Sequence, residues 1–155
     1  MNLTLALLLV ATATGAQPEA MACRAVMVVD GDTLDVTCEG QSAPVRVRLI
    51  GIDAPERGRE CAAEASEFAR VYTEGKPLRL LPRGKDTYGR LLAFVFAGEE
   101  TESLNYRLLE NGLARLYTGR FAFQNQQTFD KYKLAEIHAM TGSTCLWRGK
   151  KTARR

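Results

Sequence analysis

The order of its apolar patterns predicts an α+β fold for this sequence. An apolar run at the start is followed by two segments that alternate between apolar and polar residues, then by one stretch with helical spacing, and then by two further apolar segments before the last helical ones. Alternation with a period of two indicates strands with one buried face, whereas apolar residues three and four apart indicate an amphipathic helix. Three strands, a helix, two strands and further helices are the order of a five-stranded OB-fold β-barrel with about three helices.

The first three strands are expected at residues 24–29, 33–38 and 45–52. In the second strand, Leu34 and Val36 alternate with polar residues. The pair Asp30-Gly31 separates the first two strands, and Asp-Gly between apolar runs favours a two-residue hairpin turn in which the glycine adopts a positive φ. These segments therefore predict a hairpin followed by a third strand.

The remaining elements follow the same two patterns. A stripe of small and aromatic residues at helical spacing predicts a helix over 61–73 that ends before Gly75. Two further strands, a short helix closed by Gly112 and a final helix are expected at residues 78–81, 91–97, 103–111 and 128–140. No internal repeat appears, so a chain of 155 residues with 46% hydrophobic residues predicts one domain with a single core.

The N-terminal segment has a composition of its own. Its uncharged run NLTLALLLVATATGA is too short to span a bilayer comfortably and is followed by small residues. This pattern indicates a signal peptide over 1–22, with cleavage between Gly15 and Ala22, and hence a secreted or periplasmic protein. Because no Lys or Arg precedes the run, an uncleaved membrane tether and a misread N-terminus are the alternatives. The folded domain is expected at 23–149 and a basic tail at 150–155.

Four cysteines fit export, because an even number in a short exported chain suggests disulfides. Cys23 and Cys38 lie at similar distances on either side of the expected hairpin turn, so paired strands would bring them face to face. Of the three possible pairings, this one leaves Cys61 for Cys145 by elimination. The alternative is four buried thiols in a reducing compartment, and zinc is disfavoured since no CxxC or Cys/His cluster is present.

The net charge of +3 does not describe the whole surface. Five of the 21 basic residues lie in the C-terminal stretch WRGKKTARR, and the other 16 face 18 acidic ones. A uniformly basic surface for nucleic acids is therefore excluded. The tail on its own is more typical of a solvated chain end.

Three short clusters combine acidic and basic residues: DGDT with Asp32, VRLIGIDAPE with Arg48, Asp53 and Glu56, and DTYGR with Arg90. Two aspartates with a backbone carbonyl and water form an oxygen-only site that suits Ca²⁺ or Mg²⁺ rather than zinc. Two arginines near such an ion would stabilise charge on a phosphate, and a nearby carboxylate would orient or deprotonate water. The set therefore has the parts of a phosphodiesterase.

Six stretches between Arg24 and Gly149 occur in the order of a known family: VVDGDTLDV, VRLIGIDAPE, EASEFA, DTYGRLLAFVF, LNYRLLENGLARLY and CLWRG. In these stretches the sequence resembles the staphylococcal nuclease family, also known as the thermonuclease or micrococcal nuclease family. The resemblance implies an OB-fold nuclease that uses Ca²⁺ to cleave DNA and RNA at the 5′ side of the phosphate, leaving 3′-phosphate ends. A monomer that acts preferentially on single-stranded or fraying regions is expected.

The resemblance also implies roles for the matching positions. Asp32 and Asp53 resemble the side-chain metal ligands, and the carbonyl of Ala54 resembles a third ligand. Glu56 is similar to the carboxylate that positions the attacking water. The pair that binds and neutralises the scissile phosphate corresponds to Arg48 and Arg90.

The expected substrate contacts depart in part from the family pattern. Tyr88 resembles a residue that contacts the terminal phosphate of the substrate. Thr87 stands where the best-known member has a lysine that touches phosphate. Thr118 occupies the position of a base-stacking tyrosine, although Tyr117 is adjacent. These departures concern substrate affinity rather than the metal ligands and the two arginines.

Two other classes of protein are alternatives. An OB-fold module that binds nucleic acid without cleaving it typically loses one of the acidic or arginine positions, and all five are present here. A disulfide-stabilised structural protein of the cell envelope is the second alternative, and Ca²⁺-dependent activity would exclude it.

Overall fold

The computed structural model describes residues 19–119, 123, 125–142 and 144–148. Most of the expected signal peptide and the whole expected basic tail lie outside these residues. Met21 and Ala22, which the sequence assigns to the N-terminal segment, belong to the first strand and pair with Leu80 and Arg79.

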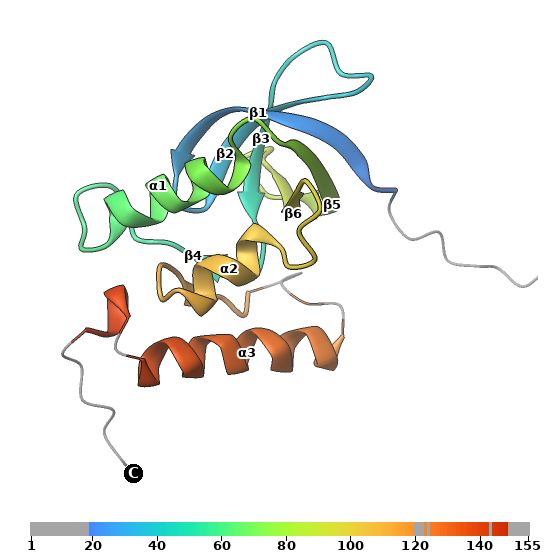
Figure 1. Cartoon of the computed structure of the whole chain (residues 1–155). Helices are drawn as coiled ribbons and strands as arrows, with labels where there is room; N and C mark the ends of the chain where they lie inside the picture. The colour runs from blue at the N-terminus through green and yellow to red at the C-terminus, as the bar shows by residue number, and fades with distance from the viewer. Residues whose placement is uncertain (1–18, 120–122, 124, 143, 149–155) are drawn as a thin grey trace, which may run out of the picture.

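Five strands form a closed barrel, which confirms the predicted fold class (Figure 1). Their order around the barrel is β1 (Met21–Asp30), β2 (Thr33–Cys38), β3 (Val45–Leu49), β6 (Leu91–Ala97) and β5 (Pro77–Lys85). Neighbouring strands are antiparallel except β3 and β6, which are parallel. Two short strands outside the barrel, β4 (Ile52–Asp53) and β7 (Arg115–Leu116), pair with each other.

Three α-helices in the described part of the chain accompany the barrel. Figure 1 shows α2 (Leu104–Glu110) between the barrel and α3 (Gln126–Thr141), while α1 (Ala62–Thr73) packs against β1. The 3₁₀ turn η1 (Cys145–Trp147) follows α3. Each helix lies within two residues of its predicted range, whereas β7 and η1 were not predicted. Within the described residues, no helix has the length and apolar character needed to cross a membrane.

The barrel interior follows the alternation that the sequence predicts. Leu34 and Val36 of β2 are buried, and so are Val47 and Leu49 of β3. The intervening Arg46 is exposed. Apolar side chains of both strands therefore fill the core, and the polar ones between them remain available at the surface.

The turn between β1 and β2 needs a glycine for a different reason from the one predicted. Asp30 pairs with Thr33, so the turn residues are Gly31 and Asp32, and Gly31 has no positive φ. A Cβ atom on Gly31 would lie 2.7 Å from the Cβ of Ala65. Glycine is required because α1 packs directly on the turn.

The predicted strand over 45–52 is wrong at its end, because the chain bends after Leu49. Gly51 has a φ of 79°, and a Cβ atom there would lie 2.8 Å from the ring of Phe123. The bend directs β4 away from the barrel to pair with β7. A glycine with a positive φ and no side chain therefore separates the two strands.

Buried Asn105 of α2 holds this bend in place. Its Nδ2 donates to the carbonyls of Ile50 at 2.9 Å and Ala93 at 3.0 Å. Its Oδ1 accepts the N–H of Val95 at 3.1 Å. One amide side chain thus satisfies backbone groups of the bend and of β6 that water does not reach.

Both expected cysteine pairs are disulfide-bonded in the structure. Cys23 and Cys38 lie opposite each other in the β1–β2 register. Cys61, just before α1, is joined to Cys145 in η1 across 84 residues. The backbone of Cys61 has a φ of 67°, the one positive φ of a non-glycine residue among those described. No cysteine of the described chain is free.

Candidate active site

Most of the predicted site residues line one pocket of about 500 Å³. Its walls are the bend between β3 and β4, the start of β6 with the loop before it, and a residue after β7. The predicted residues in this lining are Arg48, Asp53, Thr87, Tyr88, Arg90 and Tyr117. Asp32 and Ala54 adjoin the pocket through their contacts with Arg48 and with each other.

The barrel topology explains this convergence. Antiparallel pairing of β2 with β3 places Thr33 opposite Arg48, and parallel pairing of β3 with β6 places Arg48 beside Leu92. Asp32 immediately precedes β2 and Arg90 immediately precedes β6. Residues that are far apart in the sequence therefore meet at one end of the barrel.

Asp32 is a buried carboxylate whose oxygens both have partners. Its side chain accepts the N–H of Ala54 at 2.6 Å and the hydroxyl of Thr33 at 3.1 Å. Burial raises the pKa of Asp32 to about 7, although the Arg48 guanidinium and the Ala54 N–H act in the opposite direction. The ionised carboxylate therefore depends on a positive charge beside it.

Arg48 supplies that charge and links two carboxylates. Its Nη2 lies 3.1 Å from Oδ2 of Asp32 and 2.8 Å from Oδ1 of Asp53. Its Nη1 donates to the carbonyls of Leu49 at 2.8 Å and Ile52 at 2.9 Å. One nitrogen thus fixes the guanidinium to the bend, and the other lies between two carboxylates from different elements.

The convergence of two carboxylates on one cationic atom fits a divalent cation with oxygen ligands. Nη2 of Arg48 marks a point within reach of both Asp32 and Asp53. Carboxylate and carbonyl oxygens are the ligands of Ca²⁺ and Mg²⁺. The described residues contain no group of three or more His, Cys, Asp and Glu side chains that would hold a metal. The protein would therefore contribute two side chains, with a backbone carbonyl and water as the other ligands.

Arg90 is held by a residue that the sequence analysis did not select, Asp86. Nε of Arg90 donates to Oδ2 of Asp86 at 2.7 Å, and the backbone N–H of Arg90 donates to Oδ1 at 3.0 Å. Burial favours a higher pKa for Asp86, but the hydrogen bonds from Arg90 and from the N–H of Tyr88 outweigh it and lower the pKa. The position of Asp86 at the start of the DTYGR turn could have indicated this role, because Asp side chains in turns often accept hydrogen bonds from nearby backbone N–H groups.

The other predicted residues are exposed. Glu56, in the segment between β4 and α1, lies outside the pocket lining. The following residue, Arg57, donates from Nη2 to the carbonyl of Val29 at 2.7 Å and so ties this segment to β1. Tyr88 and Tyr117 line the pocket with 83% and 52% of their surface exposed. The two rings are therefore accessible to a flat ligand.

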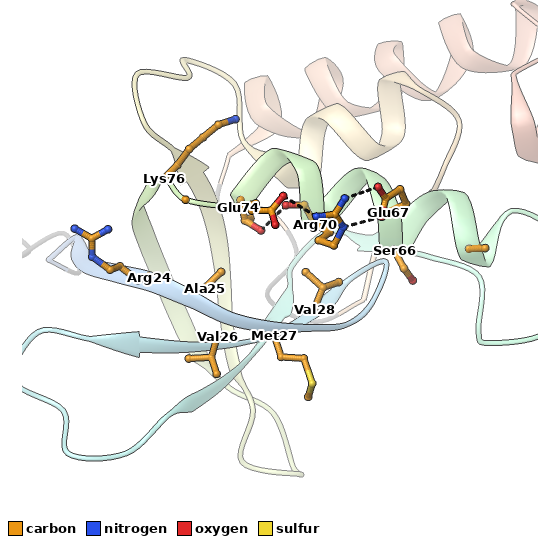
Figure 2. Close-up of a pocket in the computed structure, with 13 residues that line it drawn as sticks. Arg24, Ala25, Val26, Met27, Val28, Ser66, Glu67, Arg70, Glu74 and Lys76 are labelled. Atoms are coloured by element: carbon orange, nitrogen blue, oxygen red, sulfur yellow. Dashed lines mark hydrogen bonds and ion pairs between the residues drawn. The ribbon is translucent and has the colours of Figure 1, made fainter.

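A larger hollow of about 600 Å³ contains none of the predicted site residues. It lies between β1 and α1, where Ala25 and Val28 point toward the helix (Figure 2). Arg70 in its wall pairs with Glu67 and Glu74 at 2.6 Å each. Its charge is therefore compensated by carboxylates of α1 and of the residue that follows the helix.

The fold and the pocket together define an OB-barrel protein with two carboxylates and two arginines at one end of the barrel. Residues 46–149 match the family described as Staphylococcal nuclease homologue. The chain belongs to this family.

Individual relatives agree with this assignment. The chain is 33% identical over 132 residues to the thermonuclease of Staphylococcus hyicus, an alignment that covers 80% of this chain and 74% of that protein. It is 32% identical over 115 residues to an uncharacterized endonuclease of Haemophilus influenzae, with coverage of 74% and 63%. It is 33% identical over 99 residues to the micrococcal nuclease of Shigella flexneri, with coverage of 59% and 56%. The chain thus spans from about half to three quarters of the length of these relatives.

Proposed function

We propose that this protein is a Ca²⁺-dependent phosphodiesterase that hydrolyses DNA and RNA with low sequence specificity. The observation that carries the proposal is the meeting of Asp32 and Asp53 at one cationic atom of Arg48, with Arg90 lining the same pocket. Membership of the nuclease family and the names of the relatives support the nuclease class.

In the proposed reaction, water attacks phosphorus, the bond between phosphorus and O5′ breaks, and the phosphate remains on the 3′ oxygen. Bound Ca²⁺, held by Asp32, Asp53 and the Ala54 carbonyl, would supply Lewis-acid stabilisation of the phosphate oxygens. The guanidinium groups of Arg48 and Arg90 bind the phosphate and stabilise the negative charge that develops on it. The leaving group is the 5′-oxygen of the following nucleotide.

Glu56 is the proposed group that orients the attacking water and accepts its proton. It follows Asp53 by three residues, and the backbone between them contains Pro55, whose ring restricts the chain. Its carboxylate has no hydrogen-bond or ionic partner among the described residues. An exposed carboxylate without a protein partner is free to contact water.

Exposed aromatic rings favour single-stranded or fraying substrates. Tyr88 and Tyr117 present ring surface at the pocket, and unpaired bases stack on such rings without sequence preference. Thr87, between Asp86 and Tyr88, supplies a hydroxyl in place of a charged phosphate contact.

The protein is proposed to act as a monomer. It should therefore elute at the mass of one chain in size-exclusion chromatography with light scattering.

We also propose that the protein is exported, to the periplasm or the medium. Two disulfides in a chain of 155 residues support an oxidising compartment. Cell fractionation tests this proposal, and recovery of the protein in the cytoplasm with four free thiols would contradict it.

A cleavage assay tests the proposed activity. Plasmid DNA and single-stranded RNA are incubated with the protein and either Ca²⁺ or excess chelator. Both substrates should be cut only with Ca²⁺, and phosphatase should remove phosphate from the 3′ ends of the products. Binding of the substrates without cutting under all ionic conditions would instead identify a non-catalytic OB-fold module.

Thermal unfolding tests the metal site independently of cleavage. Ca²⁺ should raise the melting temperature of the wild type, because a ligand of the folded state stabilises it. Asp32→Asn should abolish this increase. Asp35→Asn is a matched control, because Asp35 lies on β2, the strand that follows Asp32, and pairs with Arg46 outside the 500 Å³ pocket. A Ca²⁺ response that survives Asp32→Asn would contradict the proposed ligand.

A further inference from the structure

The loop before β6 is organised around one carboxylate. Oδ1 of Asp86 accepts the backbone N–H groups of Tyr88 at 2.9 Å and Arg90 at 3.0 Å. The backbone of Asp86 also closes the loop, since its N–H donates to the Arg90 carbonyl at 3.1 Å and its carbonyl accepts the N–H of Gly89 at 3.1 Å. Gly89 has a φ of 80°, which this tight loop requires. Asp86 therefore fixes where the backbone of Arg90 lies.

The second oxygen of Asp86 fixes the side chain of Arg90. Oδ2 accepts Nε–H of Arg90 at 2.7 Å. Among the residues that the structure describes, neither Nη nitrogen of Arg90 has a hydrogen-bond partner. A guanidinium presents its N–H groups in a planar fork, so a carboxylate that occupies Nε leaves the outer Nη groups for a second anion. The ring of Tyr88 lies against the same guanidinium, with its centre 5.5 Å from the guanidinium carbon.

We infer that Asp86 is a positioning residue that presents the outer edge of the Arg90 guanidinium to the scissile phosphate. The inference rests on the proposed function, because it assigns the group that orients one of the two arginines of that site. Asp86 acts through Arg90 and not through contact with the reacting atoms.

Removal of the negative charge of Asp86 distinguishes an orienting role of this residue from a purely electrostatic one, because the two roles predict opposite effects on the reaction. Asp86 places a negative charge in the lining of a pocket that is proposed to bind phosphate. If charge alone mattered, removal of this carboxylate would strengthen binding of a polyanion and would not slow the reaction. If Asp86 orients Arg90, the same change should slow the reaction, because a misaligned donor stabilises the transition state less.

The test compares kcat and KM of three variants with those of the wild type, with Ca²⁺ and a range of concentrations of a single-stranded oligonucleotide. Asp86→Asn keeps an Oδ1 acceptor for the two loop N–H groups but replaces the Oδ2 acceptor of Arg90 with an N–H₂ donor. Asp86→Ala removes both acceptors. Glu67→Gln is the matched control, because Glu67 forms a similar two-bond pair with Arg70 on α1, away from the pocket.

For Asp86→Asn we expect kcat to fall about tenfold, the lower range for loss of an orienting partner. KM should stay the same or decrease, and the Ca²⁺-induced rise in melting temperature should be retained. Asp86→Ala should lose more activity, and Glu67→Gln should behave as the wild type. An Asp86→Asn variant with wild-type kcat, next to a damaged Asp86→Ala variant, would show that the residue only holds the loop and would overturn the inference.

A double-mutant cycle shows whether Asp86 acts through Arg90. In the background of Arg90→Ala, the further change Asp86→Asn should alter kcat less than twofold, because the group that it orients is absent. An undiminished tenfold effect in that background would overturn the inference. Absence of cleavage by the wild type would overturn the proposed function as well, whereas cleavage by the wild type and by Asp86→Asn with equal kcat would overturn this inference alone.

The hydrogen bond itself has a spectroscopic signature. The Nε–H resonance of Arg90, assigned by its disappearance in Arg90→Ala, should be protected from exchange in the wild type and exposed in Asp86→Asn. The two spectra do not depend on catalysis. Rapid exchange of this proton in the wild type would contradict the contact on which the inference depends.

Discussion

At the scale of single residues, Arg48 stabilises the site through two kinds of contact. Its Nη1 binds the carbonyls of the bend, and its Nη2 neutralises Asp32 and Asp53. Only 16% of the Arg48 side chain is exposed, and only 8% of that of Asp32. Charges with so little contact with water are strongly destabilising when their partner is removed.

We therefore predict that Arg48→Gln lowers the stability of the metal-free protein by about 3 kcal/mol, because it leaves the buried carboxylate of Asp32 without a counter-charge. Ca²⁺ should restore part of this loss by occupying the position between Asp32 and Asp53. The rise in melting temperature on addition of Ca²⁺ should thus be larger in Arg48→Gln than in the wild type. Calorimetry with Ca²⁺ and with chelator measures both effects.

Arg46→Gln provides the control for this prediction. Arg46 lies two residues before Arg48 and also pairs with an aspartate, Asp35, at 2.8 Å. Its side chain is 52% exposed, and exposed pairs of this kind contribute about 0–1 kcal/mol. Equal losses of stability in the two glutamine variants would show that burial does not increase the contribution of the Arg48 ion pairs to stability.

At the scale of elements, the bend between β3 and β4 gives the site its shape. β3 carries Arg48 inside the barrel sheet, and β4 carries Asp53 outside it. Asn105 connects this bend to β6, the strand that follows Arg90. The amide of α2 therefore keeps the two arginine-bearing segments in a fixed relation.

Asn105→Ala should destabilise the protein by at least about 2 kcal/mol, because it leaves buried backbone groups of Ile50 and Val95 without partners. Chemical denaturation measures the change. Asn111→Ala is the control, since the amide of Asn111 also donates to a carbonyl but is exposed at the end of α2. That variant should differ from the wild type by less than about 0.5 kcal/mol. A similar small effect for Asn105→Ala would contradict the assigned role.

The sequence predicts the elements better than it predicts where they bend. Alternation, short apolar runs and helical spacing report which side chains face the core, and these patterns located the five barrel strands and three helices. They contain no signal for β7, a two-residue strand whose partner β4 lies more than sixty residues earlier in the chain. The ring of Phe123 leaves no room for a side chain at Gly51 in the bend, and no local pattern reveals this proximity.

The same limit applies to the candidate site. Motif resemblance selected Asp32, Arg48, Asp53 and Arg90, and the structure brings these four to one end of the barrel. It did not select Asp86 or Asn105, because their importance depends on hydrogen bonds to distant or backbone groups. The predicted positive φ of Gly31 was wrong, since contact with Ala65 replaces turn geometry as the reason for glycine.

At the scale of the whole molecule, the two disulfides close loops of very different length. Cys23–Cys38 spans 15 residues within a hairpin, and Cys61–Cys145 spans 84 residues from the start of α1 to η1. In the chain-entropy model, closing the longer loop restricts the unfolded chain more. The second disulfide also joins the segment after Glu56 to the C-terminal part of the fold.

We predict that the double variant Cys61→Ala/Cys145→Ala loses about 4.5 kcal/mol of stability and that Cys23→Ala/Cys38→Ala loses about 3 kcal/mol, on the chain-entropy estimate. Urea denaturation of the two variants under identical conditions measures the difference. A smaller loss for the longer loop would show that native-state packing, and not restriction of the unfolded chain, determines the contribution of these bonds.

The positions of the two disulfides also determine which proteolytic cuts release a separate fragment. A single cut between 24 and 37, or between 62 and 144, leaves both fragments covalently joined. A cut in the exposed connection between β2 and β3, at residues 39–44, lies outside both loops and releases the β1–β2 hairpin as a separate fragment. On gels without reductant, limited proteolysis should therefore yield smaller bands only from cuts at 39–60 or beyond the outer cysteines. With this arrangement the protein would remain one covalent molecule after most single cleavages.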